Sequence, residues 1–207
     1  NFLGILYSDV KNYSEAEKNL RVALALQEML LSETDIDTVF MCRTNDTQVV
    51  SLGQRTDHAN SVGAAWYHSI HSDAGASTYN STLLLWGQYQ NNTEKVPNGG
   101  KAMADIMVNI LSDGMRTSTR GSWGDHQFYG RCPSSRPCPY LFINYYTDMP
   151  SELSESGFHT NPEQNQLNMN AEWKRLEART LYWSILEFHN IQKPNISILT
   201  GIVTNSE

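Results

Sequence analysis

The chain has 207 residues, 40% of them hydrophobic and 18% charged, which is enough for one well-cored domain, and it has no apolar run long enough to span a membrane. Its formal net charge is −7 and it has no basic patch, which excludes the electrostatic footprint of a nucleic-acid-binding protein. We therefore expect a globular protein with neither a membrane span nor a nucleic-acid partner.

The first part of the chain alternates between helical and strand patterns. Residues 1–13 have no clear period and are interpreted as a loop. From Ser14 apolar residues recur at helical spacing, whereas residues 37–42 form a short apolar run typical of a buried strand. Residues 51–60 predict a second helix, and the aromatic stretch 66–73 predicts a strand that ends at a Ser-Asp-Ala-Gly turn.

The second part continues this alternation. Residues 82–86 predict a strand, residues 103–111 a helix with one apolar face, residues 140–146 and 150–155 two further strands, and residues 161–189 a helical region. Strands that alternate with helices indicate an α/β fold. We expect a single, mainly parallel, twisted sheet with helices on both faces.

The chain divides into a main domain, residues 1–190, and an extension, residues 191–207. The extension starts as a linker and continues as an alternating run that resembles the first strand of a β-sandwich. Cys132 and Cys138 enclose a short loop that a disulfide could close, although their spacing alone leaves this open. Cys42 lies in an apolar stretch and is expected to be a buried thiol.

Three side chains suited to metal chemistry fall where an α/β sheet places function. Glu15 is at a helix start, and His71 and Glu155 are at the ends of two strands. Imidazole and carboxylate suit zinc, and a further carboxylate can act as a general base. His68 precedes His71 by three positions, so strand alternation puts it on the opposite face, as a core histidine. Each residue, taken alone, also has a simple structural explanation.

Seven blocks of sequence carry a family resemblance that spans about residues 14–189. They are Glu15-Ala16-Glu17-Lys18-Asn19-Leu20; Arg43-Thr44-Asn45-Asp46; Leu52 with Arg55, Ala59 and Asn60; Ser69-Ile70-His71-Ser72-Asp73; Arg120-Gly121; Met149-Pro150; and Glu155-Ser156-Gly157-Phe158 with Asn161. In this order they resemble the zinc-dependent N-acetylmuramoyl-L-alanine amidases of the type 3 family.

The resemblance implies a cell-wall hydrolase that cuts the amide between the lactyl group of N-acetylmuramic acid and the L-alanine of the stem peptide. Its implied partners are the peptidoglycan glycan and stem peptide, and its implied location is periplasmic or extracellular. Members of the family bind zinc through a His, a Glu and a second His, and a separate Glu is the catalytic base. Matched block by block, Glu15 resembles the ligand carboxylate, with Glu17 as the less favoured choice. His71 resembles the second ligand histidine, and Glu155 the catalytic base.

Two features depart from the family pattern. The first ligand histidine lies in an Asp-Pro-Gly-His-Gly-Gly turn after the first strand, and residues 1–14 contain no such motif. We expect that strand and its turn to lie outside the chain, because every later block is present; the alternative is an incomplete metal site. The second departure is Glu152, a charged residue in a predicted buried strand, which faces opposite to Glu155 and should need a partner or solvent.

Other candidates are less specific. Arg120 could grip a stem-peptide carboxylate in a bidentate manner or form a structural ion pair, and His126, in the loop that follows, could contact ligand or metal. His58, His159 and His189 are interpreted as surface or capping residues. Two alternative functions stay open: a peptidoglycan-binding or regulatory module without catalysis, and a zinc peptidase that acts on another amide.

Overall fold

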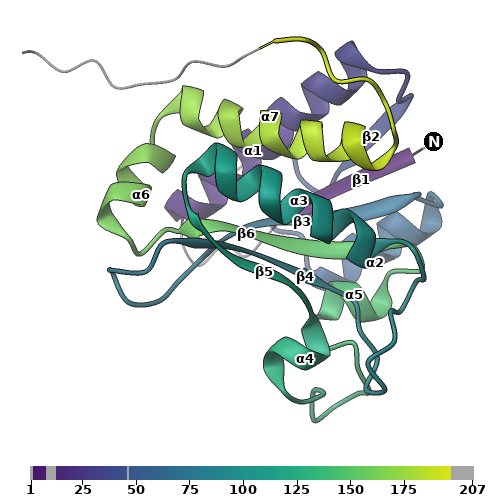
Figure 1. Ribbon diagram of the computed structural model, residues 1–207. Helices are drawn as coiled ribbons and strands as arrows, with labels where there is room; N and C mark the ends of the chain where they lie inside the picture. The colour runs from purple at the N-terminus through teal and green to yellow at the C-terminus, as the bar shows by residue number, and fades with distance from the viewer. Residues whose placement is uncertain (1, 8–12, 46, 197–207) are drawn as a thin grey trace, which may run out of the picture.

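One six-stranded sheet forms the centre of the computed structural model, which describes residues 2–7, 13–45 and 47–196 (Figure 1). The strands are β1 (Phe2–Tyr7), β2 (Thr38–Met41), β3 (Trp66–Asp73), β4 (Ser81–Trp86), β5 (Ser118–Gly124) and β6 (Ser151–Phe158). Their order is β2-β1-β3-β6-β4-β5, and every neighbouring pair is parallel except β4 with β6. The predicted mainly parallel sheet is confirmed, and it is mixed because β4 and β5 run against the other four strands.

Helices cover both faces of this sheet, as predicted (Figure 1). One face carries the three long helices α1 (Tyr13–Glu33), α3 (Gly100–Met115) and α7 (Ala171–Phe188). The other face carries α2 (Leu52–Ser61) and α5 (Phe142–Tyr146). Of the two remaining short helices, α4 (Asp125–Tyr129) contacts β4 and β5, and α6 (Pro162–Asn168) contacts β6 and α7.

The face with the three long helices holds the larger apolar core. Its fully buried members include Leu26, Ile70, Leu84, Met107 and Leu181. A buried ion pair, Lys18 Nζ to Glu177 Oε1 at 2.6 Å, joins α1 to α7 within the same layer. Because the apolar stripes of the helices and the sheet are buried together, the first turn of α1 is held above one edge of the sheet.

The first strand corrects a prediction. Residues 2–7, interpreted as part of a loop, form β1, which pairs in parallel with β2 on one side and β3 on the other. The expectation that the first strand lies outside the chain is therefore wrong. The continuous run Phe-Leu-Gly-Ile-Leu-Tyr was the available signal, because a central parallel strand is apolar along its whole length rather than alternating.

The segment 140–146, predicted as a strand, is also different in the structure, where Phe142–Tyr146 forms the helix α5. Its aromatic composition favours a strand, but tertiary contacts decide the conformation. Arg136 donates to the carbonyl oxygen of Tyr140 at 2.8 Å, and the carboxylate of Asp125 accepts the backbone N–H of Leu141 at 2.9 Å. These bonds fix the start of α5. Strand β5 was not predicted because its sequence is polar and contains glycine.

Two further predictions concern the chain's extent. The alternating run proposed as a β-sandwich strand lies outside the described residues from position 197 onward, so the boundary at residue 190 stays a prediction. Within the described ranges, no helix combines the length and apolarity that a bilayer crossing requires.

The register between β3 and β6 pairs His68 with Glu152 and His71 with Glu155. Glu152 is fully buried; its Oε1 lies 2.7 Å from Nδ1 of His68, and its Oε2 accepts the indole N–H of Trp66 at 2.5 Å. Nε2 of His68 lies 3.0 Å from the hydroxyl of Ser154. The predicted need of Glu152 for a partner is confirmed, and so is the core placement of His68.

This buried pair holds one proton in the folded protein at neutral pH. Burial raises the pKa of Glu152 well above its ordinary value and lowers the pKa of His68 to about 3, so both side chains are uncharged. In the unfolded chain the pair retains one proton, on the histidine, up to a pH of about 6.5 and none above it. Folding above that pH therefore takes up a proton.

Glu152→Gln should remove this dependence. The contribution of the pair to the free energy of unfolding should fall by about 1.4 kcal/mol per pH unit above a pH of about 6.5 in the wild-type chain, because the folded state alone keeps this proton. The amide of the variant retains an acceptor for Trp66 and a donor for His68 without titrating. Urea unfolding in chelator, at about pH 6 and about pH 8, measures the difference. Glu163→Gln, at an exposed position of α6, is the matched control; equal pH slopes for wild type and Glu152→Gln would contradict the prediction.

Candidate metal and active site

The carboxyl ends of β3 and β6 meet the first turn of α1 at one edge of the sheet. His71 and Glu155 are register partners on adjacent strands, so their side chains lie next to each other on one face. Oε1 of Glu15 lies 3.8 Å from Nδ1 of His71. The structure thus brings the three predicted site residues to one place, although they are separated by 56 and 84 positions in sequence, from 71 − 15 and 155 − 71.

His71 is a neutral imidazole in this setting. Burial, with smaller contributions from the charges of Arg55 and Lys18, lowers the pKa of His71 to about 3. Its Nε2 lies 3.1 Å from the hydroxyl of Ser69. When Nε2–H donates to that hydroxyl, Nδ1 carries the lone pair near the carboxylate of Glu15. This is the form of histidine that binds a metal.

Glu155 is the chemically unusual carboxyl of the site. Its Oε2 is buried and has no hydrogen-bond partner among the described residues. Burial, followed by the nearby carboxylates of Asp73 and Glu15, raises the pKa of Glu155 well above its ordinary value. A buried carboxyl that faces like charges is typical of a functional site, because a cation or a transferable proton relieves the repulsion.

Glu17, the alternative ligand on α1, has other partners. Its carboxylate binds Lys174 at 2.7 Å and Arg21 at 3.1 Å. Glu15 is therefore the carboxylate that α1 presents to His71.

A cavity of about 730 Å³ adjoins Glu155. Its wall includes Asp73, Arg120, Phe128, Glu155 and Phe158, so charged groups face aromatic rings across it. Arg120 donates to the carboxylate of Asp73 at 2.5 Å, and its guanidinium lies over the rings of Phe128 and Phe158 at 5.4 and 5.7 Å. The structural ion pair foreseen for Arg120 is present, and the same side chain lines a space large enough for part of a polymeric substrate.

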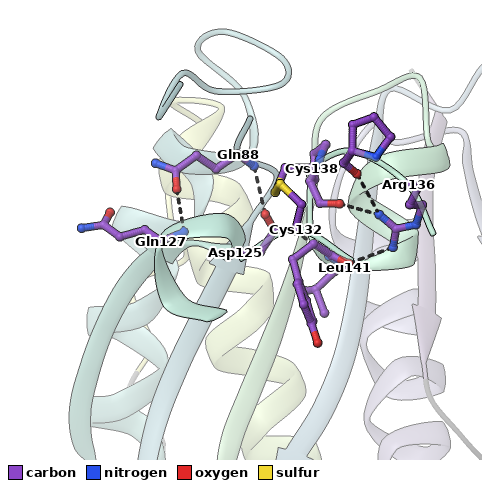
Figure 2. Close-up of a disulfide and its surroundings, with 10 residues drawn as sticks. Gln88, Asp125, Gln127, Cys132, Arg136, Cys138 and Leu141 are labelled. Atoms are coloured by element: carbon purple, nitrogen blue, oxygen red, sulfur yellow. Dashed lines mark hydrogen bonds between the residues drawn. A yellow bond between two sulfur atoms is a disulfide. The ribbon is translucent and has the colours of Figure 1, made fainter. Parts of the chain in front are cut away.

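His126 lies elsewhere, beside a disulfide. Cys132 and Cys138 are bonded, which decides the pairing that the sequence left open, and the bridge closes a loop next to α4 (Figure 2). Nδ1 of His126 is buried without a partner among the described residues, and His126 is not part of the cavity wall. Among the described residues, only His126, Cys132 and Cys138 place three ligand atoms within 4.8 Å of one another. In a disulfide the two sulfur atoms are not thiolates, so this group does not bind zinc as it stands.

The remaining cysteine, Cys42, is a free and partly buried thiol. Burial raises the pKa of its thiol to about 12, so it is a poor nucleophile at neutral pH, and the predicted burial of this side chain is found in part.

His159 is the site residue that the sequence interpretation missed. It follows β6, and its Nδ1 lies 3.8 Å from Oε2 of Glu15, with 15% of its side chain exposed. Nδ1–H donates to the carbonyl oxygen of Ser72 at 2.9 Å. The position next to Gly157-Phe158 could have suggested it, but its distance from the first helix is a tertiary fact that sequence spacing does not contain.

The segment between β1 and α1 is where the family resemblance places the first ligand histidine. In this chain residues 8–12 read Ser-Asp-Val-Lys-Asn and contain no histidine. Because β1 is present, the absence of the motif is not explained by a missing strand.

Comparisons with known proteins agree with this architecture. The family profile described as N-acetylmuramoyl-L-alanine amidase matches residues 5–187, and the chain belongs to that family. The amidase CwlM of Bacillus licheniformis is 50% identical over 64 residues, which are 31% of this chain and 25% of the relative. A sporulation-specific N-acetylmuramoyl-L-alanine amidase of Bacillus subtilis (strain 168) is 41% identical over 64 residues, again 31% and 25%. The aligned part thus spans about a quarter of each curated relative.

Solved structures show the same fold. An N-acetylmuramoyl-L-alanine amidase from Clostridium difficile 630 has a TM-score of 0.71 at 22% identity, and the alignment covers 92% of this chain and 98% of the other. The catalytic domain of CwlV from Bacillus (Paenibacillus) polymyxa var. colistinus has a TM-score of 0.70 at 20% identity, with coverages of 93% and 100%.

Glu155→Gln should make the metal-free protein more stable than the wild type, by an amount that grows as the pH rises. The folded state keeps the Glu155 proton above the ordinary value of 4.5, whereas the unfolded chain loses it, so wild-type stability should fall with rising pH by up to about 1.4 kcal/mol per unit. The amide has no such proton. Urea unfolding in chelator should show a variant advantage that is near zero at about pH 4 and grows from there, at lower pH than for Glu152→Gln. An advantage that does not change with pH would be inconsistent with a raised Glu155 pKa; Glu163→Gln again serves as the control.

Proposed function

We propose that this chain hydrolyses the amide bond between N-acetylmuramic acid and the L-alanine of peptidoglycan, in a zinc-dependent reaction. The observation that carries the proposal is the convergence of Glu15, His71 and Glu155 at one sheet edge, beside a cavity that Glu155 lines. Family membership supports the substrate class. The cell envelope, periplasmic or extracellular, is the proposed location, and the Cys132–Cys138 disulfide supports it because such bonds persist in oxidising compartments.

The donor set fits zinc. Glu15 and His71 supply a carboxylate oxygen and an imidazole nitrogen, the ligand types that zinc prefers when it is catalytic. Glu155, whose Oε2 has no partner among the described residues, is close enough to Glu15 to be affected by its charge and is not needed as a ligand. Zinc, when bound there, supplies Lewis acidity that lowers the pKa of water toward ~7 and polarises the substrate carbonyl.

Side chains of the protein would then carry out the proton transfer and bind the substrate. Glu155, deprotonated when a cation lies nearby, would accept a proton from the attacking water and return it to the leaving nitrogen of L-alanine. Arg120, already oriented by Asp73, would bind a carboxylate of the stem peptide at the cavity wall. The contact of His126 with ligand or metal stays a prediction.

One alternative has an observation in its favour. The absence of histidine from residues 8–12 is compatible with a wall-binding module that keeps the fold but does not catalyse. Metal content and product analysis distinguish the two functions.

Glu155→Gln should abolish turnover and leave zinc binding intact. Loss of a general base costs on the order of 100- to 10,000-fold in rate, whereas the amide does not remove a metal ligand. Purified peptidoglycan is digested with the wild-type and variant chains, and the newly released L-alanine amino groups are quantified together with bound zinc per chain. Glu163→Gln, outside the site, should match the wild type.

Two results would contradict the proposal. Near wild-type hydrolysis by Glu155→Gln would exclude the role assigned to that carboxyl. A wild-type chain that binds peptidoglycan but neither binds zinc nor releases L-alanine amino groups would favour the binding module.

A further inference from the structure

The disulfide beside α4 has a histidine within reach of both of its sulfur atoms. One ring nitrogen of His126 and the sulfur atoms of Cys132 and Cys138 lie within 4.8 Å of one another. In a tetrahedral zinc site, bonds of about 2.3 Å to sulfur and about 2.0 Å to nitrogen place the ligand atoms about 3.5 to 4 Å apart. Small side-chain movements would therefore bring these three donors to metal-binding distance once the bond between the sulfur atoms is broken.

The imidazole of His126 is a second, independent observation. Its Nδ1 is buried and has no hydrogen-bond partner among the described residues. Native proteins satisfy nearly all buried polar atoms, so this nitrogen calls for an explanation. A disulfide offers a histidine little, since sulfur is a weak acceptor, whereas two thiolates beside an imidazole are a set of metal ligands.

Contacts other than the covalent bridge keep the two cysteines close together (Figure 2). Arg136, which lies between them in sequence, donates to the carbonyl oxygen of Pro139 at 2.5 Å and to that of Tyr140 at 2.8 Å. Its guanidinium also lies 4.8 Å from the ring centroid of Tyr145. Reduction of the bridge leaves these contacts in place, so the loop should keep its course and the two sulfur atoms should remain neighbours.

Asp125 fixes the position of His126 relative to this loop. Its fully buried carboxylate accepts the backbone N–H of Gln88 at 3.2 Å and that of Leu141, just after the loop, at 2.9 Å. Gly130, with a φ of +66°, ends α4 and turns the chain toward the first cysteine. The histidine and both cysteines thus belong to one hydrogen-bonded unit that does not depend on the bridge alone.

We propose that the reduced chain binds one zinc ion through His126, Cys132 and Cys138, with water as the fourth ligand. Two small-molecule thiols reduce the bridge: they give up two electrons and two protons, form a disulfide of their own and leave two cysteine thiols. Zinc then displaces the two thiol protons and binds both thiolate sulfurs and a lone pair of the imidazole. Two cysteines, one histidine and a water are a ligand set that zinc adopts in proteins.

The zinc ion and the disulfide would exclude each other at one place. Helix α4 also carries Phe128 and Tyr129, which line the large cavity, so either bond would brace that wall. The disulfide form suits an oxidising compartment, and the zinc form suits a compartment rich in thiols. This inference concerns a place away from Glu155 and does not depend on the proposed function.

Zinc titration of the wild-type chain in its two redox forms tests the proposal without a substitution. The chain is stripped of metal with chelator, and half of it is reduced with a trialkylphosphine, which takes oxygen from water and becomes the phosphine oxide. Both forms are titrated with zinc under inert gas. The reduced form should bind one zinc ion per chain more than the oxidised form, because it alone has the two thiolates. Equal zinc content in the two forms would overturn the proposal.

Cobalt(II) identifies the ligands by spectroscopy. Thiolate ligands give a sulfur-to-cobalt charge-transfer band in the near ultraviolet, which the carboxylate and imidazole of Glu15 and His71 cannot give. The band should appear in the reduced wild type and in reduced Cys42→Ser, the control for the third cysteine, and it should be absent from the oxidised chain. Loss of the band in Cys42→Ser would show that a different thiol binds the metal and would exclude the proposed site.

Two substitutions separate ligation by His126 from a structural role. His126→Gln removes the imidazole and should lower the zinc affinity of the reduced chain on the order of 100-fold or more, whereas His126→Cys supplies a third thiolate and should restore tight binding. His58→Gln, at an exposed position, should bind zinc like the wild type. Wild-type affinity in His126→Gln would overturn the three-ligand site.

Near-ultraviolet circular dichroism shows whether each reduced chain keeps its tertiary structure before titration. Loss of that structure on reduction of the wild type would contradict the independent support of the loop by Arg136 and Asp125. Failure of this inference can also be told apart from failure of the proposed function. A reduced chain that gains a sulfur-bound metal ion while the oxidised chain binds none would support the inference and contradict the zinc enzyme.

Discussion

The register between β3 and β6 is the constraint on which the rest of the described structure depends. It sets His68 opposite Glu152 on the face of the long helices, and His71 opposite Glu155 on the other face. Because strand side chains alternate, a slip of one residue would exchange the two faces, remove the partner of the buried Glu152 and bury Glu155 in its place. The cost of an unpaired carboxyl in the core thus helps to specify the geometry of the candidate site, although the core pair has no part in the chemistry.

The buried glutamates of the core have hydrogen-bond or ion-pair partners, whereas the buried glutamate at the sheet edge has an oxygen without one among the described residues. In the core, Glu177 is paired with Lys18, and Glu152 is bonded by Trp66 and His68. At the edge, Glu155 keeps an oxygen without a partner among the described residues, and burial and the charges of Asp73 and Glu15 outweigh those of Lys18 and Arg120 in raising its pKa. Native proteins satisfy nearly all buried polar atoms, so an unsatisfied carboxyl at the mouth of a cavity is better explained by function than by packing. The same contrast explains why the two glutamine substitutions in β6 should affect stability over different pH ranges.

Features that depend on local sequence patterns could be predicted from the sequence, whereas features that depend on contacts between distant residues could not. Helix α1 and strand β3 have strong periodic patterns, so their positions were predictable, and motif spacing placed Glu15, His71 and Glu155 at one site. Strand β1 was missed because its apolar run has no alternation. Helix α5 was misread because its conformation depends on Arg136 and Asp125, which precede it in the chain. The distance between His159 and Glu15 depends on a bulge and on helix packing together. No local pattern contains that information.

The backbone of one residue connects the parts of the candidate site. Ser72 lies directly after His71, its N–H donates to Oε1 of Glu15 at 3.4 Å, and its carbonyl accepts from His159 at 2.9 Å. Main-chain groups cannot be removed by substitution, and they are held here by the sheet, so both the carboxylate and the second imidazole are oriented by the end of β3. The fixed element of the candidate site is therefore the end of β3, against which α1 places Glu15 and the segment after β6 places His159.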